Sequence, residues 1–345
     1  MLQHKHLLVI RLSAMGDVAM TVPVLLALTQ QHPEIKITLL TRGFFKPMFS
    51  QLPNVTVFEA DIKGKHKGVL GLLKLYKELK ALKIDAVADL HNVLRSNILK
   101  MFFKSTRIPF IQIKKGRSEK KKLTAEKNKL FAPLKTTHQR YADVFKELGF
   151  NIKLNNANLL SKENVSDTTQ DLIGKDTKKW IGIAPYAAFS GKMYPLNMME
   201  KVISILNVTN TYKILLFGGG PSETEQLNKW ATTYENATSL AGKVSFKEEL
   251  AVISKLDVMI AMDSGNAHLA AMFAIPTITL WGVTHPYAGF YPFVQKEENA
   301  LTADREKYPL IPTSVYGNKF PEGYENAMKT ISIDSVVEKI TELTN

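Results

Sequence analysis

Cysteine is absent from the 345-residue chain. This absence excludes disulfide bonds and thiolate-bound metals, and it is compatible with a reducing compartment. Long apolar runs are missing as well, because no stretch approaches the roughly 18 to 20 apolar residues of a membrane-spanning helix. Residues 7–10 are apolar but are followed at once by Arg11, and so short a run cannot serve as a signal-peptide core. We therefore expect a cytoplasmic protein, and a periplasmic solute-binding protein is disfavoured.

A dinucleotide-binding glycine fingerprint is also missing. The loop after the first predicted strand holds one glycine, Gly16, where the tight-turn pattern needs three at fixed spacing. The consecutive glycines at positions 218–220 do not supply that spacing either. A nicotinamide-dependent oxidoreductase is therefore disfavoured.

Acidic residues are scarce relative to basic ones, and the formal net charge is +13. Residues 100–129 alone contain eleven Lys or Arg against two Glu. Such a surface attracts the phosphates of nucleic acid, anionic lipid or a phosphorylated glycolipid, although a solvated face with incidental lysines explains the run equally well. No basic motif interleaved with aromatic residues is present, so nucleic acid is not an expected partner.

The chain does contain enough apolar sequence for two hydrophobic cores. Of its residues 45% are hydrophobic and 22% are charged, and 345 residues exceed what one compact unit usually needs. A polar stretch over residues 151–179 indicates the boundary. We expect an amino-terminal domain over residues 1–165, a carboxyl-terminal domain over residues 166–330 and a terminal helix within residues 331–345.

Short segments rich in Val, Ile and Leu alternate with amphipathic, helix-length segments in both halves. This alternation is typical of parallel sheets connected by helices. Helices are predicted over residues 70–83 and 141–149. The predicted strands cover residues 7–12, 37–41, 55–59 and 86–90 in the first half, and 180–184, 212–217, 238–240, 258–261 and 277–281 in the second. The sequence thus predicts an α/β fold with two Rossmann-like domains.

Ligands bind outside the carboxyl ends of the strands in open parallel sheets, so the loops after the strands are the candidate sites. The first such loop, residues 11–17, ends in Asp17 where a helix begins. The helix dipole favours the ionised carboxylate there, which suits a base that accepts a proton. The alternative is that Asp17 is an N-cap and Gly16 a turn glycine.

Two loops of the second half carry further candidates. Gly218 and Gly219 follow a predicted strand and allow close approach of a ligand, and Glu223 is placed to accept hydrogen bonds from ribose hydroxyls. A plain strand-to-helix turn explains this segment as well. In the other loop a strand ends at Asp263, and a helix starts whose amide groups can bind a diphosphate. The residues of that loop that we assign to the site are Asp263, Ser264, Gly265 and His268.

Together these motifs resemble glycosyltransferase family 9, the heptosyltransferases of lipopolysaccharide synthesis. The resemblance spans nearly the whole chain and is carried by residues 13–17, 263–268 and 280–284, and by Asp89-Leu90-His91 with Arg95-Ser96. It implies a fold of the GT-B type, with two domains facing each other across a cleft. It also implies that the amino-terminal half binds the acceptor and that the other half binds a sugar nucleotide, typically ADP-heptose.

The resemblance assigns roles to individual residues. It implies that Asp17 is the catalytic base, that Lys192 neutralises the leaving diphosphate and that Glu223 binds the ribose. Residues 263–268 would bind the phosphates and the sugar. The acceptor-binding residues that we expect are Ser13, Arg95, Ser96, Lys120, Lys121 and Lys122.

An inverting, single-displacement transfer is consistent with these residues. It needs one base on the acceptor hydroxyl and positive charge on the departing diphosphate. No carboxylate cluster suits a divalent ion, so we expect no metal and no cofactor. Ala187 and Ala188 depart from the family pattern, because hydroxyl residues often stand there. The alternatives are therefore a different nucleotide sugar with another envelope glycan acceptor, or a non-enzymatic nucleotide- or anion-binding protein.

The basic run acquires an expected role from this reading. We expect residues 114–122 to lie on the amino-terminal domain and to face anionic lipid or a phosphorylated glycolipid acceptor. The protein would then be a monomer in the cytoplasm, peripherally associated with the inner face of the inner membrane.

Overall fold

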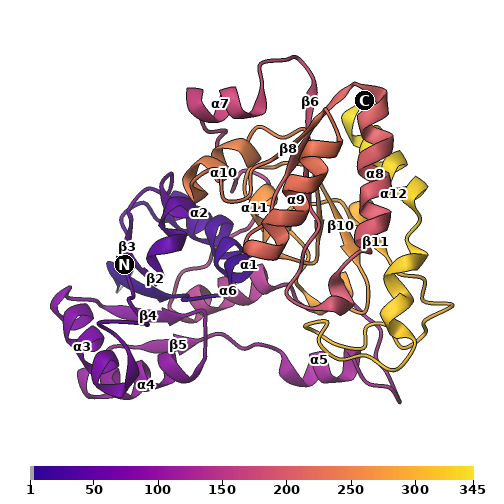
Figure 1. Cartoon of the computed structure of the whole chain (residues 1–345). Coiled ribbons are helices and arrows are strands. Elements are labelled where there is room, and N and C mark those ends of the chain that lie inside the picture. The colour runs from indigo at the N-terminus through magenta and orange to yellow at the C-terminus, as the bar shows by residue number, and fades with distance from the viewer. Residues whose placement is uncertain (1–3) are drawn as a thin grey trace. The chain divides into compact units, whose positions relative to one another are not determined.

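The computed structural model describes residues 4–345 (Figure 1). The chain forms two compact units. The first unit consists of residues up to Lys115 together with Thr137–Leu160, and the second consists of Gly116–Thr136 and Ser161–Asn345. Within residues 4–345 no helix is both long and apolar enough to cross a bilayer.

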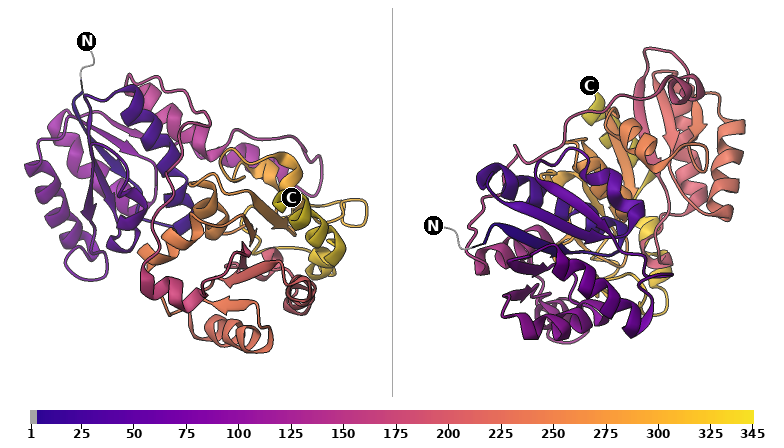
Figure 2. Two further views of the ribbon diagram at one scale, coloured as in Figure 1. Left: turned by 90° about the horizontal axis from the view of Figure 1, so that it is seen from above. Right: turned by 90° about the vertical axis from the view of Figure 1, so that its left-hand side faces the viewer.

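The first unit is built on a five-stranded parallel sheet with the strand order β3-β2-β1-β4-β5. Helices cover both faces of this sheet (Figure 2). The strands are β1 (His6–Ile10), β2 (Lys36–Thr41), β3 (Val55–Glu59), β4 (Ala86–Asp89) and β5 (Phe110–Gln112). The helices are α1 (Met15–Ala19), α2 (Thr21–Gln31), η1 (Gly43–Phe49), α3 (Gly68–Ala81), α4 (Leu94–Phe103), η2 (Lys104–Thr106) and α6 (Thr137–Glu147).

Burial explains why these segments form the sheet and its cover. The central strand β1 is flanked by β2 and β4, and its last four residues are fully buried. In α3 the side chains of Leu72, Leu75 and Leu79 recur at helical spacing and are buried in the core. The helix predicted over residues 70–83 is therefore confirmed, with bounds two residues earlier at each end.

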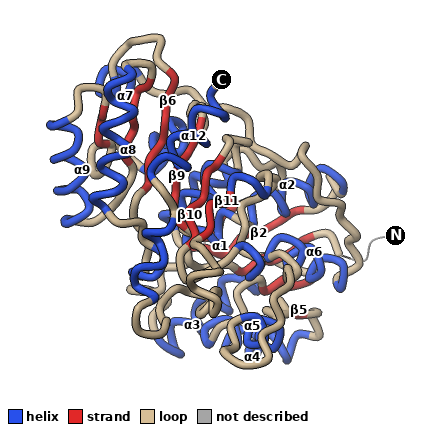
Figure 3. The backbone as a smooth tube through the Cα atoms, turned by 90° about the vertical axis from the view of Figure 1, so that its right-hand side faces the viewer, coloured by secondary structure: helices blue, strands red, loops and turns tan. Residues whose placement is uncertain are grey.

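The second unit is built on a six-stranded parallel sheet with the order β11-β10-β9-β6-β7-β8. Figure 3 labels four neighbouring strands of this sheet, β11, β10, β9 and β6. Its strands are β6 (Lys179–Ala184), β7 (Tyr212–Leu216), β8 (Ala237–Ser239), β9 (Val258–Met262), β10 (Thr277–Trp281) and β11 (Ala300–Thr302). Its helices are α5 (Arg117–Leu123), α7 (Asp167–Ile173), η3 (Ser190–Lys192), α8 (Leu196–Thr209), α9 (Pro221–Thr233), α10 (Phe246–Ile253), α11 (Gly265–Ala271), η4 (Pro286–Ala288), η5 (Glu297–Asn299), η6 (Tyr324–Thr330) and α12 (Ile333–Thr344).

The α/β fold with two parallel sheets is confirmed, and every predicted strand is present within two residues of its expected ends. The edge strands β5 and β11 were not predicted. Each has only three residues, and none of them is buried, so neither strand leaves a continuous apolar run in the sequence.

The predicted terminal helix is present as α12, and its Val336 and Ile340 side chains are fully buried in the core of the second unit. One part of the expected domain division differs from the structure. Residues 116–136 belong to the second unit, although the sequence placed them in the first domain. The reason is the Phe131 ring, which lies 3.4 Å from the Arg305 guanidinium carbon and 4.8 Å from the Tyr287 ring.

Candidate active site

The residues singled out in the sequence lie at the topological switch point of each sheet. In the first sheet the chain order reverses between β1 and β4, and in the second it reverses between β6 and β9. At such a point the loops after neighbouring strands diverge and leave a crevice for ligands. The loop that carries Asp17 follows β1, the loop that carries Lys192 follows β6, and the loop that carries Ser264 follows β9.

Asp17 lies in the first turn of α1, as predicted, and it is held by a buried arginine. Its Oδ2 atom is 2.5 Å from Arg11 Nη2, and its side chain remains 29% exposed. The hydroxyl of Tyr141 donates a hydrogen bond of 3.2 Å to the backbone carbonyl of Asp17. The carboxylate is therefore fixed in orientation while part of it stays accessible to a ligand.

Arg11 is a site residue that the sequence reasoning missed. It is buried, and its Nη1 atom donates a 2.7 Å hydrogen bond to the carbonyl of Leu90, just beyond the end of β4. Its guanidinium carbon lies 5.9 Å from the centre of the Tyr141 ring. Arg11 thus connects the loops after β1 and β4 to Asp17. The available signal was a charged residue placed directly after a buried strand.

The loop after β4 is organised by the fully buried Asp89. Its Oδ1 atom accepts 2.9 Å hydrogen bonds from the backbone N–H groups of His91 and Asn92, and its Oδ2 atom accepts one of 2.8 Å from Gln112. Because buried carboxylates are costly unless hydrogen-bonded, this network holds the loop in one conformation.

His91, which this network positions, is a buried neutral histidine. Burial, together with the positive charges of Arg11, Lys115 and Arg95, lowers its pKa to about 3, although Asp17 acts in the opposite direction. Within residues 4–345 its buried Nδ1 atom has no hydrogen-bond partner. The first switch point therefore combines the partly exposed Asp17 carboxylate with several cations and a neutral imidazole.

The three acceptor-binding residues expected in the first unit differ in availability. Arg95 is exposed and Ser13 is half-buried, so both side chains remain open to a ligand. Ser96 is fully buried, and its hydroxyl hydrogen-bonds the backbone of Val93 at the start of α4. The expectation for Ser96 is therefore wrong, because its hydroxyl is used in capping the helix.

At the second switch point Lys192 and Asp263 form an ion pair. Their Nζ and Oδ2 atoms are 2.8 Å apart, and the side chains are only 15% and 7% exposed. The pair joins the loop after β6 to the end of β9. A buried ammonium held in this way is pre-positioned for an anionic ligand.

Glycines allow the chain to pack closely around this lysine. The N–H group of Val283 donates a 3.0 Å hydrogen bond to the carbonyl of Gly191, so the loop after β10 lies against the Lys192 turn. Gly317 has a φ angle of +75°, and a methyl group there would collide with the Lys192 side chain. The position of Lys192 thus depends on a small residue far along the sequence.

Ser264, Gly265 and His268 surround the end of β9 as predicted. Ser264 precedes α11, and its buried hydroxyl has no hydrogen-bond partner within residues 4–345. Gly265 is the first residue of α11, and His268 is buried in the same helix. A buried hydroxyl without a protein partner, next in sequence to the Lys192–Asp263 pair, is free to donate to a bound oxygen.

The glycine loop after β7 holds Glu223 in a defined position. The N–H group of Gly219 donates a 2.8 Å hydrogen bond to Glu223 Oε2, and Gly218 packs closely on Leu227. Burial and the nearby Glu223 charge raise the pKa of Tyr186, which stands on the loop after β6. Tyr186 is a second site residue that the sequence reasoning missed, because a lone tyrosine in a loop carries no distinctive pattern.

The structure corrects the expectation for the basic run. Lys120, Lys121 and Lys122 lie on α5 and belong to the second unit, not to the amino-terminal domain. The Lys120 ammonium lies 4.0 Å from the centre of the Phe290 ring, also in the second unit. Residues 100–115 remain in the first unit, so the basic run is divided between the two units.

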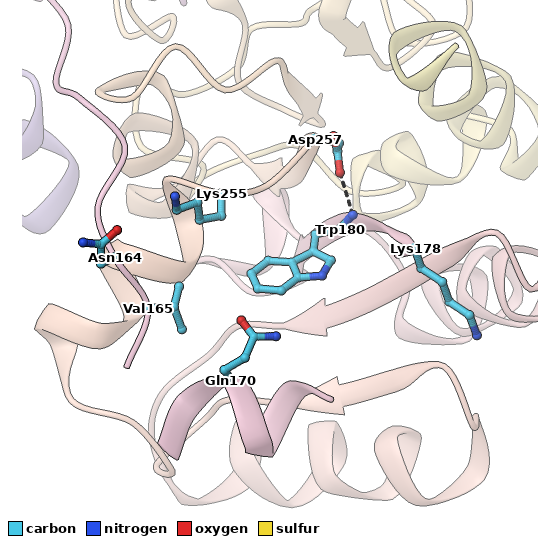
Figure 4. A pocket seen from close by; sticks show the side chains of 7 residues that line it. All are labelled: Asn164, Val165, Gln170, Lys178, Trp180, Lys255 and Asp257. Atoms are coloured by element: carbon cyan, nitrogen blue, oxygen red, sulfur yellow. Dashed lines mark hydrogen bonds between the residues drawn. The ribbon is translucent and has the colours of Figure 1, made fainter. Parts of the chain in front are cut away.

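A hollow of about 490 Å³ lies at the end of the second sheet opposite to the candidate active site (Figure 4). The Trp180 ring stands in it, and the backbone N–H of Trp180 donates a 2.7 Å hydrogen bond to Asp257 Oδ2. Trp180 is near the start of β6 and Asp257 directly precedes β9, so this hollow is at the amino ends of the strands. It is separate from the candidate active site.

Comparison with known proteins extends these observations. Residues 72–315 match the family model described as glycosyltransferase family 9 (heptosyltransferase). Over 294 residues the chain is 26% identical to the lipopolysaccharide core heptosyltransferase OpsX of Haemophilus influenzae, and the match covers 82% of this chain and 80% of that protein.

Solved structures share the fold. A family 9 glycosyltransferase from Veillonella parvula superposes with a TM-score of 0.76 at 20% identity, covering 99% of this chain and 97% of that one. The heptosyltransferase WaaC of E. coli with ADP gives a TM-score of 0.66 at 20% identity, covering 98% and 99%. The fold is therefore of the GT-B type.

Proposed function

The chain belongs to glycosyltransferase family 9, and on this basis we propose that it transfers heptose from ADP-heptose to a lipopolysaccharide core acceptor. The Haemophilus relative is named as a heptosyltransferase of this core, and the E. coli structure contains ADP. The observation that carries the proposal is the position of Asp17 and Lys192, each at the switch point of its own sheet.

The proposed reaction is a single displacement with inversion. An acceptor hydroxyl attacks the anomeric carbon of the donor from the side opposite the diphosphate, and a new carbon–oxygen bond forms. The bond from the anomeric carbon to the diphosphate oxygen breaks, and its electron pair leaves with the diphosphate. Asp17 takes the hydroxyl proton as general base, and Arg11 keeps its carboxylate in position.

Lys192 has the complementary role in the second unit. Its ammonium group neutralises the charge that develops on the departing diphosphate, and Asp263 holds the lysine in place. The Ser264 hydroxyl donates to a diphosphate oxygen, and His268 and the backbone at Gly265 complete this side of the donor. Glu223 binds the ribose hydroxyls, with Gly218 and Gly219 giving the nucleotide room to approach.

The proposed reaction uses no metal ion and no cofactor. Lys192 supplies positive charge where other transferases use a divalent ion. Among residues 4–345 no three His, Asp or Glu side chains converge as metal ligands. Ser13 and Arg95 would contact a phosphorylated glycolipid acceptor, and the enzyme would act as a cytoplasmic monomer on the inner face of the inner membrane.

A different nucleotide sugar is the second candidate donor, and a specific observation favours it. Ala187 and Ala188 carry no hydroxyl groups at positions where heptosyltransferases of this family often have them. A donor whose diphosphate contacts rely on Lys192 and Ser264 alone would tolerate this difference.

A two-part experiment tests the proposed function. Thermal-shift measurements against ADP, UDP, GDP and their sugars identify the nucleotide, because a ligand that binds only the folded state raises the melting temperature. Mass spectrometry of a truncated core acceptor incubated with ADP-heptose then detects the transfer. A melting shift with ADP and a heptose-sized mass increase are expected. A melting shift with another nucleotide and not with ADP would show that the donor is a sugar of that nucleotide. The absence of a shift with every nucleotide would reject the proposed function.

A further inference from the structure

Helix α3 and the loop before it form a strongly basic, exposed segment of the first unit, whose function the candidate active site leaves unexplained. Residues 63–83, which include α3 and the loop before it, contain seven Lys and one Glu, a net charge of +6. All seven lysines are exposed. The one glutamate, Glu78, is ion-paired with Lys65 at 2.8 Å. The remaining lysines of this segment therefore have no neutralising carboxylate within the segment itself.

The lysines lie on one face of α3. Leu72, Leu75 and Leu79 are buried in the core, and Lys74, Lys77 and Lys80 are exposed on the opposite face. Among residues 4–345, none of these three lysines is ion-paired with a carboxylate. An uncompensated row of ammonium groups attracts a surface with dense negative charge.

Large aliphatic side chains are exposed beside these lysines. At the start of α3, Val69 is 60% exposed and Leu70 is 82% exposed. Helix α4 packs beside α3, because the Tyr76 ring lies 5.0 Å from the Phe103 ring, and Leu94 at the start of α4 is 77% exposed. Aliphatic side chains standing among lysines favour a surface that is anionic outside and apolar just beneath.

We propose that the outer face of α3 and the start of α4 bind an anionic phospholipid bilayer. The lysines contact the lipid phosphates, and Val69, Leu70 and Leu94 enter the boundary between headgroups and acyl chains. Nucleic acid does not fit this face, because its exposed apolar groups are aliphatic and offer no ring for base stacking. The inference rests on the proposed function only in placing the enzyme at a membrane.

The basic segment 117–129, which includes α5 and the loop after it, provides a comparison within the same chain. Lys121, Lys122 and Lys127 are exposed in the second unit. Another cation of that segment already has partners within the protein, since the Lys129 ammonium donates hydrogen bonds to the carbonyls of Leu123 and Pro312. The sequence pointed to this segment, whereas the structure favours α3.

Vesicle sedimentation with the full chain tests the proposal. The vesicles contain phosphatidylethanolamine and phosphatidylglycerol without any glycolipid, and phosphatidylcholine vesicles serve as the neutral reference. The variant Lys74→Glu/Lys77→Glu/Lys80→Glu should reduce partitioning by on the order of 100-fold, because each lysine near an anionic surface contributes appreciably. The variant Lys121→Glu/Lys122→Glu/Lys127→Glu has the same charge change and should bind like the wild type.

The apolar contribution is tested separately by Leu70→Ser. Val208→Ser on α8 is its matched control, because Val208 is 80% exposed in the second unit. Only Leu70→Ser should weaken binding, by on the order of tenfold. Unchanged melting temperatures and ADP shifts in all variants show that folding and donor binding are intact.

Several outcomes would overturn the proposal. If the wild type does not sediment with anionic vesicles, the face serves a soluble acidic partner and not a membrane. Equal loss in the α3 and α5 variants would show that only net charge matters. Loss in the α5 variant alone would return the role to that helix. None of these results depends on transferase activity, so the proposed function can fail or stand independently.

Discussion

At the scale of single residues, Asp17 is not the N-cap of α1, because that position belongs to Ala14. Its side chain is bound to Arg11, and its backbone carbonyl accepts the Tyr141 hydroxyl. Arg11 comes from the loop directly after β1 and Tyr141 from α6, and these segments are far apart in sequence. A capping residue needs neither contact, so the arrangement favours a carboxylate kept in position for chemistry.

The variant Asp17→Asn removes the proposed base while it keeps the size of the side chain. Turnover should fall by about 100-fold or more, the usual scale for the loss of a general base. Donor binding should stay near normal, because Asp17 and the Lys192–Asp263 pair lie in different units. Initial rates and ADP thermal shifts measure the two effects. Near-wild-type turnover would exclude Asp17 as the base.

His285 makes the stability of the second unit depend on pH. Burial lowers its pKa to about 4, and Arg305 contributes to the lowering. The unfolded chain therefore binds the proton at higher pH than the folded chain does. The stability that depends on neutral His285 is fully present above the unfolded pKa of 6.5. It is lost as the pH falls toward 4, and the free energy of unfolding decreases by up to roughly 3 kcal/mol.

The variant His285→Asn tests this dependence, since asparagine can still accept the hydrogen bond from the Tyr287 N–H group. Denaturant unfolding between pH 4.5 and 7.5 should show a smaller loss of stability on acidification than in the wild type. Identical pH slopes in the two proteins would contradict the assignment, whatever the difference in absolute stability.

At the scale of elements, the loop before η6 determines where Lys192 can lie. Gly317 and Gly323 both adopt positive φ angles, of +75° and +86°. A methyl group at Gly317 would meet the Lys192 side chain, whereas at Gly323 no atom lies within 4 Å of it. Substitutions at the two glycines can therefore distinguish the effect of backbone strain from a steric effect on Lys192.

Alanine at each position provides a matched pair. Both variants should lose about 1 kcal/mol of stability from the unfavourable φ angle. Only Gly317→Ala should also weaken ADP binding, by roughly tenfold or more, because Lys192 must move away from Asp263. Calorimetric titration with ADP distinguishes them. Equal ADP affinities in the two variants would show that Lys192 does not bind the diphosphate.

At the scale of the whole molecule, the two units have separate cores and separate proposed tasks. Hydrogen exchange should show this division directly. ADP should slow exchange in the loops after β6 and β9, which carry Lys192 and Ser264, and in the loop after β7 with the first turn of α9, which carries Glu223. Strands β1 to β4 should exchange at unchanged rates. Protection spread evenly over both units would contradict the assignment of the nucleotide to the second unit.

Much of the fold was predictable because it depends on local pattern. Strands such as β1 and β9 are continuous apolar runs, and α3 repeats its leucines at helical spacing, so the sequence determines both elements and their parallel arrangement. The loops with Asp17 and Asp263 were identifiable because they directly follow buried strands. The three-residue strands β5 and β11 were not, since pairing at a sheet edge and not apolar pattern defines them.

The sequence alone determined the two α/β sheets, the strand-end position of the candidate residues and the family resemblance, because each depends on residues close together in the chain. Tertiary structure decided which groups meet. It alone brought Arg11 to Asp17 and Lys192 to Asp263, buried Ser96 and assigned α5 to the second unit. These outcomes depend on contacts between distant segments, whose energies are set by packing and burial that no local pattern records.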